Sequence, residues 1–104
     1  MTEKVTRSSL AIKDIGDLAE YYRVEAGLTV AHQFVNNTEM AVKALASYPQ
    51  MGATLGLSGS ERDIRRWHIE GFPRLLILYR PTEDGITIIR VLDAGRDIAD
   101  LFPE

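Results

Sequence analysis

The first half of the chain repeats its apolar residues at the spacing of an α-helix. Ser8 or Ser9 can cap a first helix by accepting a backbone N–H, and Gly27 can end it in a conformation that glycine adopts without strain. The apolar stripe of this helix consists of Ile12, Ile15, Ala19 and Tyr22, with Leu18 beside them. The acids between these positions are expected to form a solvated face: Asp14, Asp17 and Glu20.

The same spacing predicts a second helix, which Thr29 can cap and which Pro49 and Gly52 end. Because only about two residues separate the two helices, they are expected to run antiparallel as a helical hairpin. The apolar stripe of the second helix consists of Ala31, Phe34, Thr38, Ala41 and Leu45, with Val35 and Val42 at its edge.

Beyond the second helix the apolar residues no longer follow a helical period. Residues 52–60 are rich in glycine and small side chains, which is typical of a loop. The sequence Pro-Thr-Glu-Asp-Gly at 81–85 has the chemistry of a hairpin turn between two apolar strands. Strands are expected at residues 4–7, 74–80 and 86–92, and residues 63–70 alternate loosely.

These elements predict an α+β fold, with an N-terminal α-helical hairpin packed on a small antiparallel β-sheet. Residues 1–104 are expected to form a single domain, because 104 residues that are 45% hydrophobic suit one core. The strand at 74–80 shows little polar alternation, so we expect it at the centre of the sheet. Either the chain covers both faces of this strand, or helices cover one face and a partner covers the other.

Composition excludes several kinds of site. The chain has no cysteine, which rules out disulfides, thiolate nucleophiles and cysteine-ligated metals. Its longest apolar run, residues 75–79, is too short to cross a bilayer, and residues 1–9 lack the apolar core of a signal peptide. We therefore expect a cytoplasmic protein without membrane contacts.

The charge pattern directs attention to the second half of the chain. The net charge of −3 argues against a broad phosphate-binding surface, and we expect no direct sequence-specific binding of nucleic acid. From residue 58 onward every positively charged residue is an arginine, whose planar fork suits carboxylate and phosphate groups. These arginines are Arg62, Arg65, Arg66, Arg74, Arg80, Arg90 and Arg96.

Three blocks of residues carry a family resemblance. The first helix contributes Ala11, Asp14, Ile15, Leu18, Tyr21 and Tyr22. The second contributes Ala31, Phe34, Leu45, Ala46, Pro49 and Gly52. The third consists of Gly71, Phe72, residues 76–80 (LILYR), Asp84, Gly85, Ile88, residues 90–92 (RVL) and residues 95–97 (GRD). In this order and spacing the chain resembles the RelE/ParE toxin superfamily, and within it the ParE branch, over nearly its whole length.

The resemblance implies the toxin of a type II toxin–antitoxin system, such as a plasmid stabilisation system. The expected partner is a ParD-like antitoxin, encoded beside the toxin, whose C-terminal segment wraps the toxin in a hetero-oligomer. ParE-type toxins act on DNA gyrase, whereas RelE-type toxins cut messenger RNA on the ribosome. One fold therefore supports two activities, and residues must decide between them.

Two positions argue against RNA cleavage, which needs a base, a cation and an acid around the scissile phosphate. Arg96 stands where the resemblance expects an arginine of the RelE site. Phe102 stands where a tyrosine would help, and it has no ionisable group. Asp93 stands where many relatives have histidine, and its carboxylate would repel phosphate. We therefore assign no catalytic residue.

Two sets of residues remain as candidate contacts. Arg80, Arg90 and Arg96 are candidates for target binding, although they could instead form structural ion pairs with acids such as Asp93 or Asp97. The candidates for antitoxin binding are Arg62, Arg65, Arg66 and Trp67. The alternatives for this second set are a solvated strand edge for the arginines and core packing for the tryptophan.

The two histidines do not indicate a metal site. His32 is expected to be a partly buried polar side chain at the edge of the second helical stripe. His68 follows Trp67 and is expected to be a surface residue. Because no further ligand types cluster with either, we expect no metal and no cofactor.

Three hypotheses remain. The first is a non-enzymatic poison that binds gyrase and is neutralised by its antitoxin. The second is a ribosome-dependent messenger RNA endoribonuclease with an altered site. The third is a non-toxic member that binds an antitoxin only.

Overall fold

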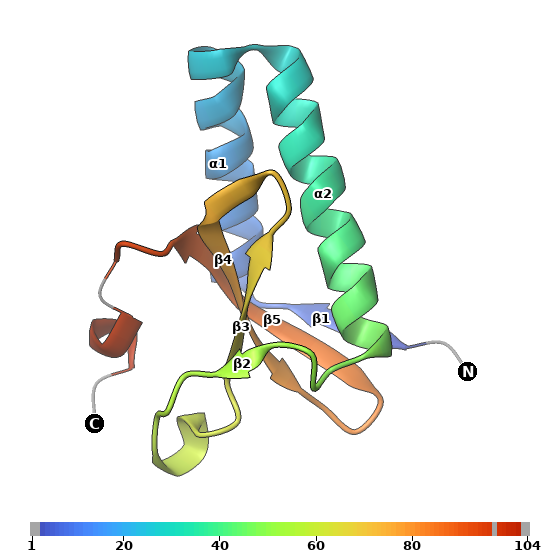
Figure 1. Cartoon of the computed structure of the whole chain (residues 1–104), viewed down its shortest axis with the longest axis vertical. Helices are drawn as coiled ribbons and strands as arrows, with labels where there is room; N and C mark the ends of the chain where they lie inside the picture. The colour runs from blue at the N-terminus through green and yellow to red at the C-terminus, as the bar shows by residue number, and fades with distance from the viewer. Residues whose placement is uncertain (1–2, 97, 103–104) are drawn as a thin grey trace.

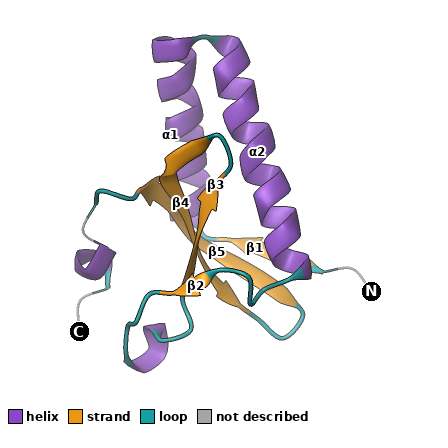
Figure 2. Cartoon of the chain, in the orientation of Figure 1, coloured by secondary structure: helices purple, strands orange, loops and turns teal. Residues whose placement is uncertain are grey.

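The computed structural model describes residues 3–96 and 98–102 of the protein. A helical hairpin stands on a twisted sheet of five strands (Figures 1 and 2). The elements are β1 (Lys4–Arg7), α1 (Ser9–Ala26), α2 (Leu28–Ser47), β2 (Ala53–Thr54), η1 (Gly59–Glu61), β3 (Arg65–Ile69), β4 (Phe72–Pro81), β5 (Gly85–Asp93) and η2 (Ile98–Leu101).

The ends of α1 are formed as the sequence predicts. The Ser8 hydroxyl accepts the Ala11 N–H at 3.0 Å, which pairs one of the free donors of the first turn. Gly27 ends α1 with a φ of 95°, which side chains disfavour. The predicted Thr29 cap is wrong, because Gly27 is also the residue before α2 and no side chain caps that helix. A single residue thus separates the two helices.

The hairpin buries one stripe from each helix. In α1 the predicted stripe packs against the core except for Ile12, which is 59% exposed because the buried position belongs to Ala11. In α2 the buried residues include Val42 and Ala46, while Val35 is exposed. Rings from three elements, Tyr22, Phe34 and Phe72, lie with their centroids 5.0–5.6 Å apart.

The sheet has the strand order β1-β5-β4-β3-β2. The four strands from β2 to β5 pair antiparallel, in agreement with the prediction. β1 differs, because it pairs parallel to β5 and makes the sheet mixed. The helical hairpin lies between β1 and the rest of the sheet in the sequence, and a parallel pair needs a long connection of this kind. The α+β class is confirmed.

The central strand β4 is covered on both faces by the chain itself. Alternate residues Leu75, Ile77 and Tyr79 join the main core under the helices. Leu76 and Leu78 join a second cluster on the opposite face, together with Ile64, Leu92, Leu55, Ile89, Ile98, Leu101 and Phe102. The first of the two predicted arrangements for this strand is therefore the one observed.

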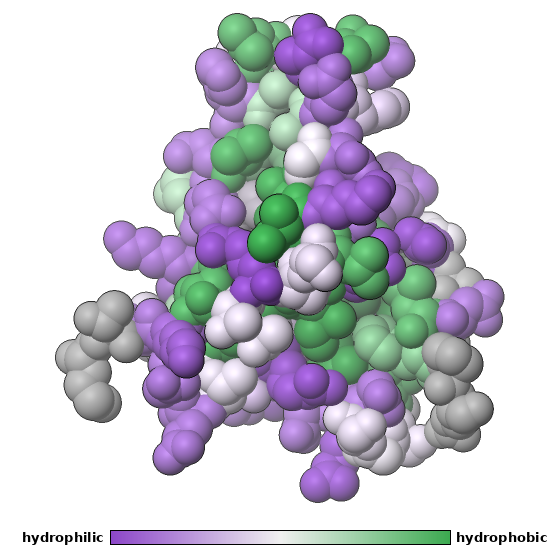
Figure 3. Space-filling model, turned by 180° about the vertical axis from the view of Figure 1, so that it is seen from behind, coloured by the Kyte–Doolittle hydropathy of each residue, from purple (hydrophilic) through white to green (hydrophobic). Residues whose placement is uncertain are grey.

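The hairpin projects beyond the sheet and keeps apolar surface at its tip. Val24 and Leu28, on either side of the connection at Gly27, are 63% and 58% exposed. Figure 3 shows this apolar surface from behind, next to hydrophilic side chains. Within the described ranges, neither helix is both long and apolar enough to span a membrane.

Candidate functional site

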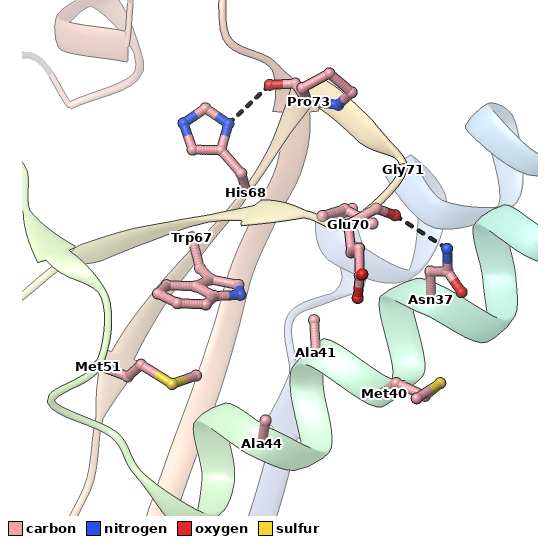
Figure 4. A pocket seen from close by; sticks show the side chains of 11 residues that line it. Asn37, Met40, Ala41, Ala44, Met51, Trp67, His68, Glu70, Gly71 and Pro73 are labelled. Atoms are coloured by element: carbon pink, nitrogen blue, oxygen red, sulfur yellow. Dashed lines mark hydrogen bonds between the residues drawn. The ribbon is translucent and has the colours of Figure 1, made fainter.

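An open and mainly apolar groove of about 650 Å³ lies between α2 and β3 (Figure 4). The second helix contributes small and flexible side chains to it, and β3 with the following turn forms the opposite wall. Its lining residues are Asn37, Met40, Ala41, Ala44, Met51, Trp67, His68, Ile69, Glu70, Gly71 and Pro73. Such a surface suits a partner with apolar side chains.

Trp67 forms the centre of the groove wall. Its half-buried side chain packs against the main core, and its indole ring extends toward Met51 and Ala44 (Figure 4). Within the part of the chain that the structure describes, the indole N–H has no hydrogen-bond partner. Core packing and an interface role, the two alternatives for this residue, are therefore compatible.

The outer edge of β3 is only partly paired. β2 pairs with Arg66 through Ala53 and with Arg65 through Thr54. Over residues 67–69 no described strand lies on this edge, and the groove runs beside it. At the far end of the groove the Asn37 side chain donates a hydrogen bond of 3.0 Å to the Glu70 carbonyl, which joins α2 to the turn after β3.

Arg65 is the structural member of the arginine cluster. Its guanidinium donates to the carbonyl oxygens of Gln50 and Gly52, at 3.3 and 2.7 Å, and to the Gln50 side chain at 2.6 Å. These bonds fasten the loop after α2 to the sheet. Arg65 therefore fixes the shape of the surface near the groove.

Arg62 and Arg66 are both exposed, but the three arginines of this cluster do not form one patch, because Arg66 lies apart from the other two. Arg66 follows Arg65 in a strand, so its side chain points to the opposite face. Arg62 lies 4.0 Å from the Asp63 carboxylate and lines a smaller hollow with Arg65, Gln50, Thr54, Asp63 and Pro81. The three arginines are close in the sequence, which suggested a single basic cluster, but their side chains do not gather on one face.

Arg90 forms an ion pair that the sequence did not reveal. Its guanidinium donates two hydrogen bonds to the Asp14 carboxylate, at 2.7 and 3.0 Å. The same carboxylate accepts the Val91 N–H at 3.0 Å. Both side chains are about 15% exposed (16% and 14%), so the prediction that Asp14 faces water is wrong.

A register shift explains this pairing. Leu78 pairs with Arg90, but the next residue, Tyr79, pairs with Ile88, so that Ile89 is an extra residue in β5. Such a bulge turns the side chains that follow it. The structure confirms that Arg90 has an acidic partner. The acid is Asp14 of α1 and not Asp93, which was one of the acids expected. Asp97, another predicted partner, lies outside the described residues.

Arg80 and Arg96 lie at opposite ends of the β4–β5 hairpin. Arg80 pairs in the sheet with Thr87 near the turn, and its guanidinium donates one hydrogen bond of 3.2 Å to the Ser60 carbonyl. Arg96 follows Asp93 at the other end, where its exposed side chain has no ion pair with any described residue. The three candidate target-binding arginines therefore do not form one site.

Asp93 is held by neighbours. The Gly95 N–H donates to its carboxylate at 2.7 Å, and Arg74 donates at 3.1 and 3.3 Å. The Gly95 hydrogen bond and the Arg74 guanidinium lower the pKa of Asp93. Phe102 packs against the second apolar cluster.

The histidines lie apart. The Nδ1 atom of His68 is 2.8 Å from the Pro73 carbonyl oxygen, so this nitrogen carries the proton. His32 is exposed on α2, and the expectation that it is partly buried is wrong because it points away from the stripe. Among the residues described, no group of histidine and acidic side chains could hold a metal ion.

A family model matches nearly the whole chain. The family is described as the ParE toxin of type II toxin-antitoxin system, parDE, and the match covers residues 5–98. The chain belongs to the ParE toxin family. It is thus the toxin type of a type II toxin–antitoxin system, as the sequence motifs predicted. A search of the curated proteins finds no match to it.

Solved structures share the fold of this ParE-family toxin. A chain of the chromosomal ParDE TA system from P. aeruginosa is 20% identical, with a TM-score of 0.70 over 86% of this chain and 94% of that chain. A YafQ mutant from E. coli is 19% identical, with a TM-score of 0.56 over 98% and 100%. The E. coli DinJ-YafQ complex contains a chain that is 18% identical, with a TM-score of 0.52 over 98% and 100%.

Two features of the ParE-family toxin were not predicted from its sequence. The contact between Asp14 and Arg90 joins residues far apart in the chain, and Arg90 lies next to the bulge in β5. The open edge of β3 depends on the short length of β2, which lies in a glycine-rich segment without strand periodicity. Asp14 in α1 and Arg90 in β5 both belong to the motifs that carry the family resemblance. That shared membership was the one sequence signal that could have pointed to their contact.

Proposed function

We propose that this ParE-family toxin arrests growth by binding DNA gyrase in the cytoplasm, without cleaving RNA, and that a ParD-type antitoxin neutralises it in a hetero-oligomer. The observation that carries the proposal is membership of the ParE family over residues 5–98. Gyrase is the target implied by the ParE branch of the superfamily. Plasmid stabilisation is the corresponding cellular role.

The side chains at the two positions where a RelE-type site would have catalytic groups, Asp93 and Phe102, favour target binding over RNA cleavage. An Asp93 carboxylate that is held ionised by Arg74 and by the Gly95 N–H is a poor base and repels a phosphate. The Phe102 ring packs in an apolar cluster and has no proton to give. Messenger RNA cleavage therefore has the weaker support of the two toxic activities.

Solved structures that share this fold support an antitoxin as the partner. The solved structures with this fold include a ParDE toxin–antitoxin system and the DinJ-YafQ complex. The groove between α2 and β3 offers apolar surface to such a partner. A toxin that is stored in complex needs a large interface of this kind. A non-toxic member would keep this interface and lack the action on gyrase.

Purified gyrase tests the proposal directly. In the presence of gyrase, the native toxin should convert relaxed or supercoiled plasmid DNA into cleaved DNA bound to gyrase. The antitoxin should abolish this effect. Arg80→Ala and Arg96→Ala should weaken the effect about tenfold each, because each removes a positive charge that can bind the target; Arg96 is exposed and Arg80 is half-buried. Unchanged circular dichroism would separate lost binding from lost folding.

The control is Lys43→Ala, which removes an exposed charge from α2, outside the β4–β5 hairpin. Gyrase that keeps its normal activity in a large excess of native toxin would contradict the proposal. If gyrase is poisoned equally by both arginine variants, the target is right and the two arginines are excluded as contacts.

A further inference from the structure

Both methionines that the structure describes line the groove between α2 and β3. Of the three methionines in the chain, Met1 lies outside the described residues, and Met40 and Met51 lie in the groove. They are 62% and 38% exposed. A methionine side chain adapts well to apolar partners, but its thioether sulfur is open to oxidation where solvent reaches it. The groove therefore combines an apolar surface with oxidisable groups.

Met51 is held in place by the loop that follows α2. Its N–H donates to the Tyr48 carbonyl at 3.0 Å, and the N–H of the next residue, Gly52, donates to the buried Tyr79 hydroxyl at 2.8 Å. From this loop the Met51 side chain extends into the groove on the side of Trp67 (Figure 4). Because the backbone is fixed at this point, the sulfur stays at the wall of the groove that a partner covers.

Met40 has different surroundings on the helix side of the groove. The Asn36 side-chain amide donates to the Met40 sulfur at 3.7 Å. A thioether is a weak acceptor and a sulfoxide oxygen is a polar one, so the same amide can pair with an oxidised Met40. Within the described ranges, no hydrogen bond reaches the sulfur of Met51. Oxidation is therefore expected to disturb the groove mainly at Met51.

We propose that Met51 is an oxidation site, at which hydrogen peroxide converts the free toxin into a form that binds its antitoxin more weakly. This proposal rests on the proposed antitoxin partner and on its contact with the groove. The sulfur lone pair of Met51 attacks one peroxide oxygen, so that an S–O bond forms and the O–O bond breaks. The sulfur loses two electrons, and the departing hydroxide takes the proton of the transferred hydroxyl and leaves as water.

The sulfoxide changes what the partner must bury. An apolar partner that covers Met51 also covers the new S–O group beside Trp67, and burial of a polar group without a hydrogen bond is unfavourable. In the complex the partner shields the sulfur, whereas in the free toxin the residue is 38% exposed. Peroxide therefore acts on the free toxin and delays its neutralisation.

The first test treats three purified chains with hydrogen peroxide: native, Met51→Leu and Met40→Leu. Leucine keeps the apolar volume and forms no sulfoxide. Peptide mass spectrometry locates the added oxygen, and each chain is titrated with the product of the adjacent gene. Treatment should weaken the binding of the native chain and of Met40→Leu about tenfold, and should leave the binding of Met51→Leu unchanged. Circular dichroism before and after treatment checks that the fold is retained.

The second test needs no oxidant. Met51→Gln places a polar group of similar length at the same exposed position and should bind the antitoxin about tenfold more weakly than Met51→Leu. Met40→Gln is the matched control and should bind as the native chain does, because Asn36 can pair with the new amide. Methionine sulfoxide reductase should restore the binding of the treated native chain.

The outcomes separate this inference from the proposed function. If Met51 stays unoxidised at a dose that oxidises Met40, or if the Met51 sulfoxide binds the antitoxin as the native chain does, the oxidation site is overturned and the antitoxin partnership stands. Equal loss of binding in treated Met51→Leu would assign the effect to another group and also overturn it. If the untreated native chain does not bind the antitoxin, the proposed partner fails and the oxidation proposal fails with it.

Discussion

At the scale of single residues, Tyr79 joins the sheet to the loop that follows α2. Its buried hydroxyl accepts the Gly52 N–H and donates to the Pro49 carbonyl, both at 2.8 Å. Tyr79→Phe should lower the free energy of unfolding by about 2 kcal/mol, because it leaves both partners unpaired. Urea denaturation measures this change, and Tyr48→Phe, at a 70% exposed position, is the control.

The same hydroxyl predicts a pH dependence. Burial raises the pKa of Tyr79, so the folded state favours the neutral phenol. Its contribution to stability is complete below the unfolded pKa of about 10 and is lost as the pH rises through the higher folded-state pKa. The alkaline decline in stability should therefore be smaller for Tyr79→Phe, and an equal decline would show that other groups cause it.

The Asp14–Arg90 pair is a second test at this scale. Asp14→Ala should cost about 2–3 kcal/mol, because it leaves a mostly buried guanidinium and the Val91 N–H without an acceptor. Asp17→Ala removes an exposed acid paired with Lys13 and should change stability by less than about 0.5 kcal/mol. Equal thermal unfolding of the two variants would mean that the buried pair adds no stability.

At the scale of elements, most of the fold follows from local pattern. Helical spacing predicts α1 and α2, and the apolar runs predict β4 and β5 to within two residues at each end. The Thr29 cap and the burial of Ile12 failed because the hairpin connection is a single glycine, and because the sheet selects Ala11 for the face of closest contact. The parallel pairing of β1 is a property of the assembled sheet and has no local signal.

The β1–β5 pair gives a prediction at this scale. A side chain at Gly85 would approach the Lys4 carbonyl oxygen to 1.8 Å, so Gly85→Ala should detach β1 and cost about 1–3 kcal/mol. Gly16→Ala is the control, because nothing lies within 4 Å of the added carbon, and it should stabilise α1 by about 0.5–1 kcal/mol. Hydrogen exchange at residues 4–7 would stay slow in Gly85→Ala if the strand pair tolerated the methyl group.

At the scale of the whole molecule, the arginines of the second half serve different purposes. Arg65 and Arg90 hold the fold through buried or half-buried contacts, whereas Arg66 and Arg96 are exposed. The sequence directed attention to the arginines of the second half of the chain, and the structure shows structural contacts for Arg65 and Arg90. The sequence could not show which arginines make structural contacts and which stay exposed. That difference depends on the direction of each side chain in the folded sheet.

The central claim is that this ParE-family toxin acts on gyrase. The most direct test is a pulse-label after induction in bacteria without the antitoxin, with thymidine and methionine incorporation followed separately. We predict that thymidine incorporation falls first and that a DNA-damage response accompanies it. If methionine incorporation falls first, the ribosome is the target, and the carboxylate of Asp93 and the ring of Phe102 do not prevent RNA cleavage.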